Sequence, residues 1–216
     1  MRKGLTEVVF ILDRSGSMAG LEKETIGGFN SLIEKQKKEE GEALISTVLF
    51  DNVSEVLHDR VPVGSVVTMT DKDYYVRGCT ALLDAVGGAI THIRRVHKYI
   101  REEDRPEKTL FVITTDGYEN ASHQYSSAKV KELIQQQKEC GWEFLFLGAN
   151  IDAVQEAAKF GIDEACAVDY CCDARGTELN YEVLSAAVSQ VRSSGAGKKL
   201  DRGWKKRIEE DYAERR

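Results

Sequence analysis

The sequence predicts an α/β fold of three layers (α/β/α), in which helices cover both faces of a doubly wound, mostly parallel sheet with one antiparallel edge strand. Two observations support this prediction. Short apolar runs rich in β-branched residues, which are typical of strands buried on both faces, alternate with segments whose apolar residues recur at helical spacing. One further run alternates apolar and polar residues, as an edge strand does.

The first half of the chain supplies three expected strands and two expected helices. Residues 7–13 (EVVFILD) are a short apolar run that ends in an acid, which favours a buried strand. The next segment has apolar residues at helical spacing and fades into the charged stretch 34–42, which we interpret as a solvated helix end. Residues 43–51 (ALISTVLFD) predict a second buried strand, and the alternating run 54–63 predicts the edge strand. Residues 80–100 show helical spacing again.

The second half continues the alternation of apolar runs and helical periodicity. The remaining strands are expected at 109–115, 144–147 and 165–170. The remaining helices are expected around 130–134, at 152–160 and around 184–191. In open α/β sheets, ligands bind beyond the carboxyl ends of the strands. Asp13 and Asp116 each follow a buried strand, so we expect both carboxylates at the binding edge.

Length and composition indicate one domain with an appendage. The chain has 216 residues, of which 42% are hydrophobic, which suits a single domain at 1–193. From residue 194 to 216 the composition becomes strongly charged, and Trp204, Ile208 and Tyr212 recur every four residues. This tail is therefore predicted to form an amphipathic helix, which either docks on its own domain or binds a partner.

The charge balance argues against two classes of partner. Thirty basic residues face 36 acidic ones, a net charge of −6, which gives no general electrostatic reason to bind nucleic acid or membrane lipid. No apolar run approaches the roughly 18 residues that a membrane-spanning helix needs. The apolar stretch 8–12 is shorter than a signal-peptide core of about 7–15 residues. The expected location is the cytoplasm.

The five cysteines are interpreted as reduced thiols. Their number is odd and no CxxC pair occurs, which suits partly buried thiols in a reducing compartment. A zinc site built from Cys166, Cys171 and Cys172 lacks a fourth ligand at a usual spacing, so we reject it.

One set of residues carries the chemistry. Asp13, Ser15 and Ser17 place a carboxylate and two hydroxyls at alternate positions of a loop that leaves a strand. Alone this pattern is weak, because Asp and Ser also form turns and cap helices. The prediction becomes stronger with Thr80, in Gly-Cys-Thr-Ala-Leu before a helix, and Asp116, in Thr-Asp-Gly after a buried strand.

With these motifs, residues 5 to 193 resemble a von Willebrand factor type A (VWA) domain of the bacterial intracellular type, a Rossmann-like fold with a metal-ion-dependent adhesion site (MIDAS). The resemblance implies that Ser15, Ser17 and Thr80 coordinate a divalent ion through their hydroxyls, while Asp13 and Asp116 act directly or through water. Hard oxygen ligands of this kind suit Mg²⁺ or Mn²⁺, with Ca²⁺ as a further candidate.

The resemblance implies a non-catalytic function. An acidic residue of a partner protein would complete the metal site, and the chain could serve as a regulatory or scaffold subunit. Loop residues near the site are candidate partner contacts because aromatic and arginine side chains favour interface anchors. These candidates are Arg14, Tyr74, Tyr75, Arg77, Tyr118 and Glu119. Asp51 is either a group that supports the metal ligands or a turn residue, and Asp84 could cap or orient nearby hydroxyls.

The alternative is a metal-dependent hydrolase or phosphoryl-transfer enzyme that uses the same strand-end Asp and Ser residues. Neither Ser15 nor Ser17 lies in a Gly-x-Ser-x-Gly nucleophile motif, and no histidine stands at an obvious base position. The stretch 194–199 contains a Gly-Lys pair as a phosphate loop does, but Arg192 stands where the first glycine of that pattern belongs. Lys199 stands where the pattern has Ser or Thr. The sequence therefore favours a binding module.

Overall fold

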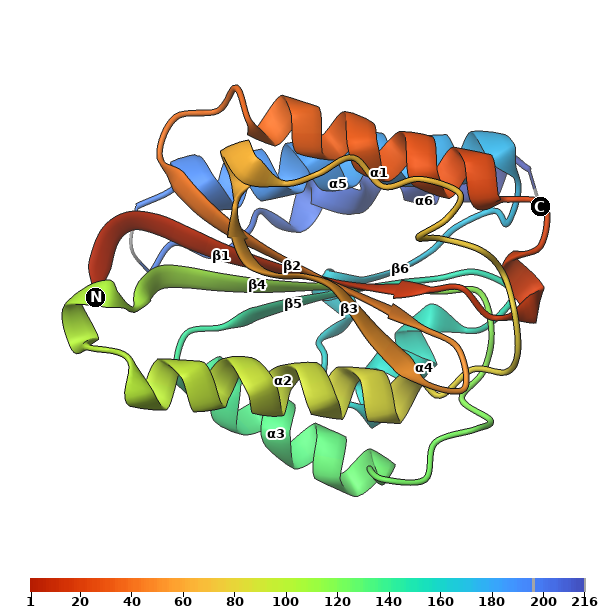
Figure 1. Cartoon of the computed structure of the whole chain (residues 1–216). Coiled ribbons are helices and arrows are strands. Elements are labelled where there is room, and N and C mark those ends of the chain that lie inside the picture. The colour runs from red at the N-terminus through yellow and green to blue at the C-terminus, as the bar shows by residue number, and fades with distance from the viewer. Residues whose placement is uncertain (196, 216) are drawn as a thin grey trace.

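The computed structural model describes residues 1–195 and 197–215, and it shows a six-stranded sheet between two layers of helices (Figure 1). The strands are β1 (Arg2–Asp13), β2 (Glu42–Phe50), β3 (Ser54–Pro62), β4 (Pro106–Thr115), β5 (Glu143–Gly148) and β6 (Ala167–Asp169). The helices are α1 (Glu22–Gln36), α2 (Leu82–Tyr99), α3 (Ser127–Glu139), α4 (Ala153–Lys159), α5 (Ala174–Ser193) and α6 (Lys206–Glu214).

The sheet has the order β3-β2-β1-β4-β5-β6. In the described part of the chain, four neighbouring pairs are parallel, and only the edge strand β3 runs antiparallel to its neighbour β2. Figure 1 shows α1, α5 and α6 on one face and α2, α3 and α4 on the other. The predicted fold class, three layers with one antiparallel edge strand, is confirmed.

The central strand β1 shows why the sheet lies between two helical layers. Its side chains point alternately to the two faces. Phe10 packs in the core beneath α1 and α5, and the next residue, Ile11, packs in the core that includes α2 and α3. Both side chains are fully buried. An apolar run without polar alternation is what a strand with two buried faces requires.

Several boundaries differ by a few residues from the sequence-based expectation, and β1 and α1 show why. Strand β1 begins at Arg2 instead of residue 7, because the Arg2 amide donates to the Arg105 carbonyl at 2.7 Å and extends the pairing with β4. The first residues of β1 are mostly polar, so a search for apolar runs did not detect them. Helix α1 ends at Gln36, so most of the charged stretch 34–42 lies in the turn before β2.

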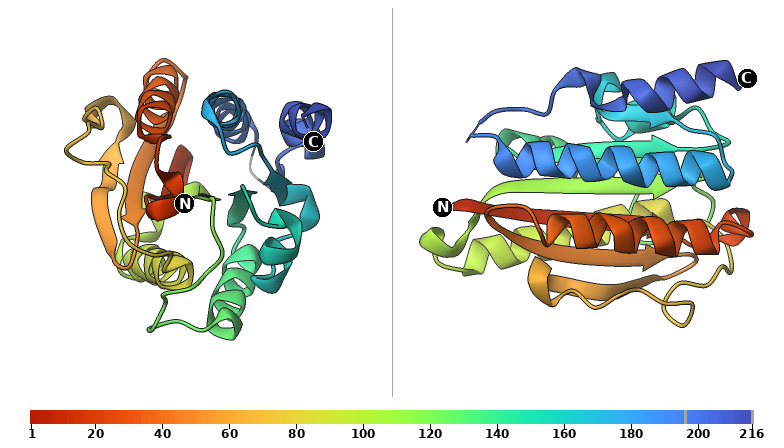
Figure 2. Two further views of the ribbon diagram at one scale, coloured as in Figure 1. Left: turned by 90° about the vertical axis from the view of Figure 1, so that its right-hand side faces the viewer. Right: turned by 90° about the horizontal axis from the view of Figure 1, so that it is seen from above.

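The C-terminal segment packs on the domain. Figure 2 shows α6 beside α5, on the face that also carries α1. Trp204 Nε1 donates to the Ala165 carbonyl at 2.9 Å, Lys205 Nζ donates to the Ala167 carbonyl at 2.8 Å, and Ile208 is buried. The predicted tail, 194–216, contains two residues outside the described part of the chain, 196 and 216. Its division from a domain at 1–193 stays a prediction.

Two helical glycines allow close packing. An added Cβ on Gly28 of α1 would lie 2.4 Å from Tyr181 Cδ2, and one on Gly87 of α2 would lie 2.4 Å from Tyr125 Cδ1. Their neighbours Gly27 and Gly88 face open space. None of the helices in the described part of the chain has both the length and the apolar character that a membrane span needs.

Candidate metal centre

The loop after β1 brings two serine hydroxyls together. Asp13 is the last residue of β1, and the short 3-10 turn Gly16–Met18 curls the chain immediately afterwards. The Ser15 and Ser17 Oγ atoms lie 3.1 Å apart. The Ser15 amide donates to Asp13 Oδ1 at 2.7 Å, so the carboxylate orients the loop that carries both hydroxyls.

Thr80 joins this pair from the loop that precedes α2. Its Oγ1 donates to Ser15 Oγ at 3.0 Å. Its backbone is held from the loop after β4, because its amide donates to Asn120 Oδ1 at 2.9 Å and its carbonyl accepts from the Asn120 amide at 3.0 Å. The threonine hydroxyl is therefore fixed by two loops that are distant in the sequence.

Asp116 closes the cluster from the end of β4. Its Oδ1 accepts a hydrogen bond from Ser17 Oγ, and its Oδ2 lies 3.7 Å from the Cys172 thiol. Asp13 is fixed from the same strand end, because Thr115 Oγ1 donates to its Oδ2 at 2.6 Å. Hydrogen bonds therefore connect all five sequence-predicted residues in one cluster at the carboxyl edge of the sheet.

The cluster places two buried carboxyl groups close together. Asp13 and Asp116 are only 1% and 2% exposed, whereas Ser17 is exposed and opens the cluster to solvent. Burial raises the pKa of Asp116 to about 6, and the nearby Asp13 carboxylate adds to the rise. Burial also raises the pKa of Asp13. Within the described part of the chain, neither carboxylate forms an ion pair, so the site lacks an internal counter-cation.

This donor set fits a hard divalent cation. Two carboxylates and three hydroxyls offer only oxygen, which suits Mg²⁺ or Mn²⁺ better than a soft metal. Among residues 1–195 and 197–215, no group of three or more His, Cys, Asp or Glu could hold a metal. The residues that would hold the ion are Asp13, Ser15, Ser17, Thr80 and Asp116, and this assignment stays a prediction.

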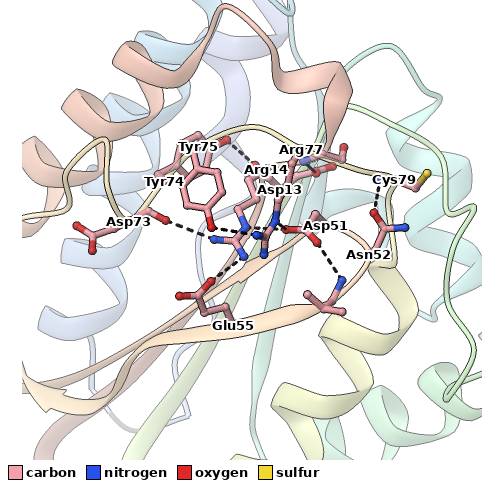
Figure 3. Close-up of polar contacts among 12 residues, drawn as sticks. Asp13, Arg14, Asp51, Asn52, Glu55, Asp73, Tyr74, Tyr75, Arg77 and Cys79 are labelled. Atoms are coloured by element: carbon pink, nitrogen blue, oxygen red, sulfur yellow. Dashed lines mark hydrogen bonds and ion pairs between the residues drawn. The ribbon is translucent and has the colours of Figure 1, made fainter.

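Two of the six candidate partner contacts need correction. Arg14 is fully buried, and its Nε donates to Asp51 Oδ2 at 2.9 Å (Figure 3). Tyr74 is 1% exposed, and its hydroxyl donates to the Asp13 carbonyl at 2.5 Å. These side chains point into the protein, because buried acceptors satisfy their polar groups, and they cannot touch a partner in this arrangement.

Of the other four candidates, three have exposed side chains, and the fourth, Glu119, bonds backbone amides. Tyr75 and Tyr118 are 41% and 51% exposed, and the Arg77 side chain is 43% exposed, so a partner role for them stays a prediction. The Glu119 carboxylate instead accepts from the Leu83 amide at 2.8 Å. It also accepts from the amides of Ala121 and Ser122, and thereby fixes the start of α2 against its own loop.

The hydrogen bonds of Asp51 and Asp84 define the roles of these two acids. Asp51 accepts from both Arg14 and Arg77. Asp84 does not contact the hydroxyls of the cluster, because its carboxylate accepts from three backbone amides. These are the amides of His123, Gln124 and Tyr125.

Two neighbours of the cluster, Thr115 and Cys172, were not predicted from the sequence. Thr115 precedes Asp116 and bonds Asp13, and its place at the end of a strand beside β1 was the available signal. Cys172 approaches Asp116 from the loop after β6 and gave no signal, because nothing in its local sequence marks it. All five cysteines are free.

Known proteins resemble this chain in structure. No protein-family model matches the sequence, and no curated protein matches it. The vWF domain of the type V pili tip protein Mfa5 from Porphyromonas gingivalis aligns with a TM-score of 0.61 and 11% identity, over 89% of this chain and 98% of that one. The Rpn10 VWA domain aligns with a TM-score of 0.57 and 12% identity, over 83% and 95%.

A third similar structure contains a metal. Proximal thread matrix protein 1 from the mussel byssus, with a zinc-occupied MIDAS motif, aligns with a TM-score of 0.58 and 14% identity. The alignment covers 86% of this chain but 46% of the mussel protein, so the chain spans about half of that protein's length. At these identities the likeness concerns the fold. The chain has the fold of a von Willebrand factor type A domain.

Proposed function

We propose that this chain is a non-catalytic module that binds a protein partner in the presence of a divalent cation, with an acidic residue of the partner completing the metal site. One observation carries the proposal. Two buried carboxylates and three hydroxyls meet at the carboxyl edge of the sheet, and no cation of the described residues neutralises them. A divalent cation would supply the missing positive charge.

The charge arithmetic supports an acidic partner. A Mg²⁺ or Mn²⁺ ion would present a positive centre toward solvent at the exposed Ser17 side of the cluster. Three of the five donors are neutral hydroxyls, so the ion's field remains able to attract an anionic oxygen from outside. The zinc-occupied MIDAS motif of the mussel protein supports a divalent ion at a site of this fold.

The surroundings of the two serines favour binding over hydrolysis. The serine triads of hydrolases use a histidine as the base that takes the serine proton. In the described residues, Ser15 and Ser17 bond hydroxyls and a carboxylate. Histidine rings bond elsewhere, as His58 does with Thr47 and His97 with Glu7. A metal-dependent hydrolase or phosphoryl-transfer enzyme is therefore the alternative proposal. Turnover of a phosphate or ester substrate by the purified chain would establish it.

The first experiment measures Mn²⁺ binding by calorimetry. Thr80→Ala removes one donor without changing the charge, and we expect the Kd to rise at least about tenfold, since even groups that only support metal ligands contribute about 10- to 100-fold. Thr68→Ala, an exposed threonine, is the matched control and should bind as the wild type does. Equal binding by both variants would contradict the assignment of Thr80.

The second experiment tests partner recognition. The wild-type chain is used to capture proteins from a native lysate in Mg²⁺ or in EDTA, beside the Thr80→Ala and Thr68→Ala variants. We expect a protein retained only in Mg²⁺, by the wild type and by Thr68→Ala, and lost when the contacting Asp or Glu of the captured protein is neutralised. Capture that is equal in EDTA would contradict a metal-dependent site.

The cellular setting is also a proposal. Five free thiols suit a reducing compartment such as the cytoplasm. There the module would act as a regulatory or scaffold subunit whose exposed Tyr75, Arg77 and Tyr118 select the partner.

A further inference from the structure

Arg14 stands between two predicted metal ligands, yet its side chain leaves the metal centre and enters the protein. It is fully buried, and its guanidinium reaches three different groups, as Figure 3 shows. Nε donates to Asp51 Oδ2 at 2.9 Å, and Nη2 donates to Glu55 Oε2 at 2.8 Å. Nη1 donates to the Asp73 carbonyl at 3.4 Å. One side chain thereby connects the metal loop to the turn after β2, to the start of β3 and to the loop before α2.

Asp51 is the centre of this cluster. Its Oδ2 accepts from Arg14 and also from Arg77 Nε at 2.7 Å, and its Oδ1 accepts from the Val53 amide at 3.1 Å. Its side chain is 3% exposed. Two arginines therefore share one buried carboxylate, and removal of either guanidinium would leave that charge poorly compensated.

The same cluster fixes the loop that carries Thr80. The Cys79 amide donates to Asn52 Oδ1 at 2.8 Å, and the Ala81 amide donates to the Asp51 carbonyl at 2.9 Å. Both neighbours of Thr80 are thus bonded to the turn after β2. Gly78 has a φ of +69°, and a Cβ there would lie 1.9 Å from Asn52 Oδ1, so this close approach requires glycine.

Direct bonds also join this loop to the metal loop. The Arg77 amide donates to the Arg14 carbonyl at 2.9 Å, and the Gly16 amide donates to the Gly78 carbonyl at 3.1 Å. Two hydrogen bonds therefore pair the backbones of both loops directly.

We propose that Arg14 is a positioning residue for the metal centre: through Asp51 and Arg77 it holds the loops that carry Ser15 and Thr80 at the spacing that the ion needs. This inference rests on the proposed metal-dependent function. It requires an arginine, because the three acceptors bond three different nitrogens of the planar guanidinium, whereas lysine offers one nitrogen, Nζ. A residue of this kind acts on metal affinity through the ligands it orients.

The test compares Arg14→Lys and Asp51→Asn with the wild type. We expect the Mn²⁺ Kd, measured by calorimetry on folded protein, to rise about 10- to 100-fold in both variants. Arg60→Lys is the matched control, because Arg60 pairs with the buried Glu7 at 2.6 Å but does not contact the cluster, and its Kd should stay at the wild-type value. A wild-type Kd in folded Arg14→Lys and Asp51→Asn would overturn the proposal.

A metal-free measurement separates this inference from the proposed function. Hydrogen exchange in EDTA reports the amides of Gly16, Cys79 and Ala81, which the two loops use to bond their neighbours. In Arg14→Lys we expect these amides to exchange at least about tenfold faster while amides of β5 keep their protection. If the wild type binds no Mn²⁺, the proposed function fails, and unchanged exchange at these three amides would then overturn the positioning role as well.

Discussion

Replacing Asp116 by asparagine should stabilise the metal-free domain while it abolishes metal binding. The Asp116 carboxylate has a pKa of about 6 in the folded chain, raised from the ordinary value of 3.8 by burial and by the nearby Asp13 charge. The folded state therefore binds this proton more tightly than the unfolded state does. Between about pH 4 and pH 6, ionisation of Asp116 therefore lowers the free energy of unfolding as pH rises. Above about pH 6 the full cost of burying the ionised carboxylate is present.

The magnitude follows from the pKa difference. A rise of about two units corresponds to at most about 3 kcal/mol at neutral pH, because each unit is worth about 1.4 kcal/mol. Solvent reaches the cluster at the exposed Ser17 and screens the charge, so we expect a penalty of about 1–2 kcal/mol. Asparagine keeps the shape of the side chain, and its Oδ1 can still accept the hydrogen bond from Ser17.

The assay is urea unfolding in EDTA and in Mn²⁺. In EDTA at neutral pH, Asp116→Asn should have a free energy of unfolding about 1–2 kcal/mol above that of the wild type, and this gain should shrink toward zero near pH 4. Mn²⁺ should raise the stability of the wild type only, because the variant lacks a ligand. Asp71→Asn, at an exposed aspartate, controls for net charge. The reasoning is refuted if Asp116→Asn is less stable than the wild type in EDTA, or if Mn²⁺ stabilises both equally.

Two further predictions concern stability away from the metal centre. Gly28→Ala should lower the free energy of unfolding, measured in urea, by about 1–3 kcal/mol because its Cβ meets the Tyr181 ring. Gly27→Ala, one residue earlier and facing open space, should raise it by up to about 1 kcal/mol. Equal effects of the two substitutions would contradict the packing argument. Burial acts to raise the pKa of Asp84, but bonds from amides such as that of His123 outweigh it and lower the pKa. Its stabilisation should therefore be present at neutral pH and lost as pH falls below about 4, and thermal melts should show a smaller acid loss in Asp84→Asn.

The sequence was sufficient to find the cluster because its chemistry follows from the fold. A buried run that ends in an acid predicts a parallel strand and puts its carboxylate at one edge of the sheet, and this applies to both Asp13 and Asp116. Ser15, Ser17 and Thr80 then join through loops that leave or approach the same edge. Once β1 and β4 lie side by side in the sheet, the five expected residues come together at its edge.

The roles of Arg14 and Tyr74 could not be predicted in the same way. A charged or aromatic residue in a loop beside a binding site suggests an exposed anchor. The acceptors that bury these two side chains lie 37 and 61 residues away in sequence, at Asp51 and at the Asp13 carbonyl. Local sequence contains no sign of such pairings, because only the tertiary structure brings these loops together.

The most direct test of the metal centre is the anomalous scattering of crystals soaked in Mn²⁺. We predict one strong peak at the carboxyl edge of the sheet, within about 2.0–2.3 Å of the hydroxyls of Ser15, Ser17 and Thr80, with one ligand position facing solvent beside Ser17. A peak elsewhere only, or no peak when Mn²⁺ is saturating, would contradict the assignment of these side chains as a metal site.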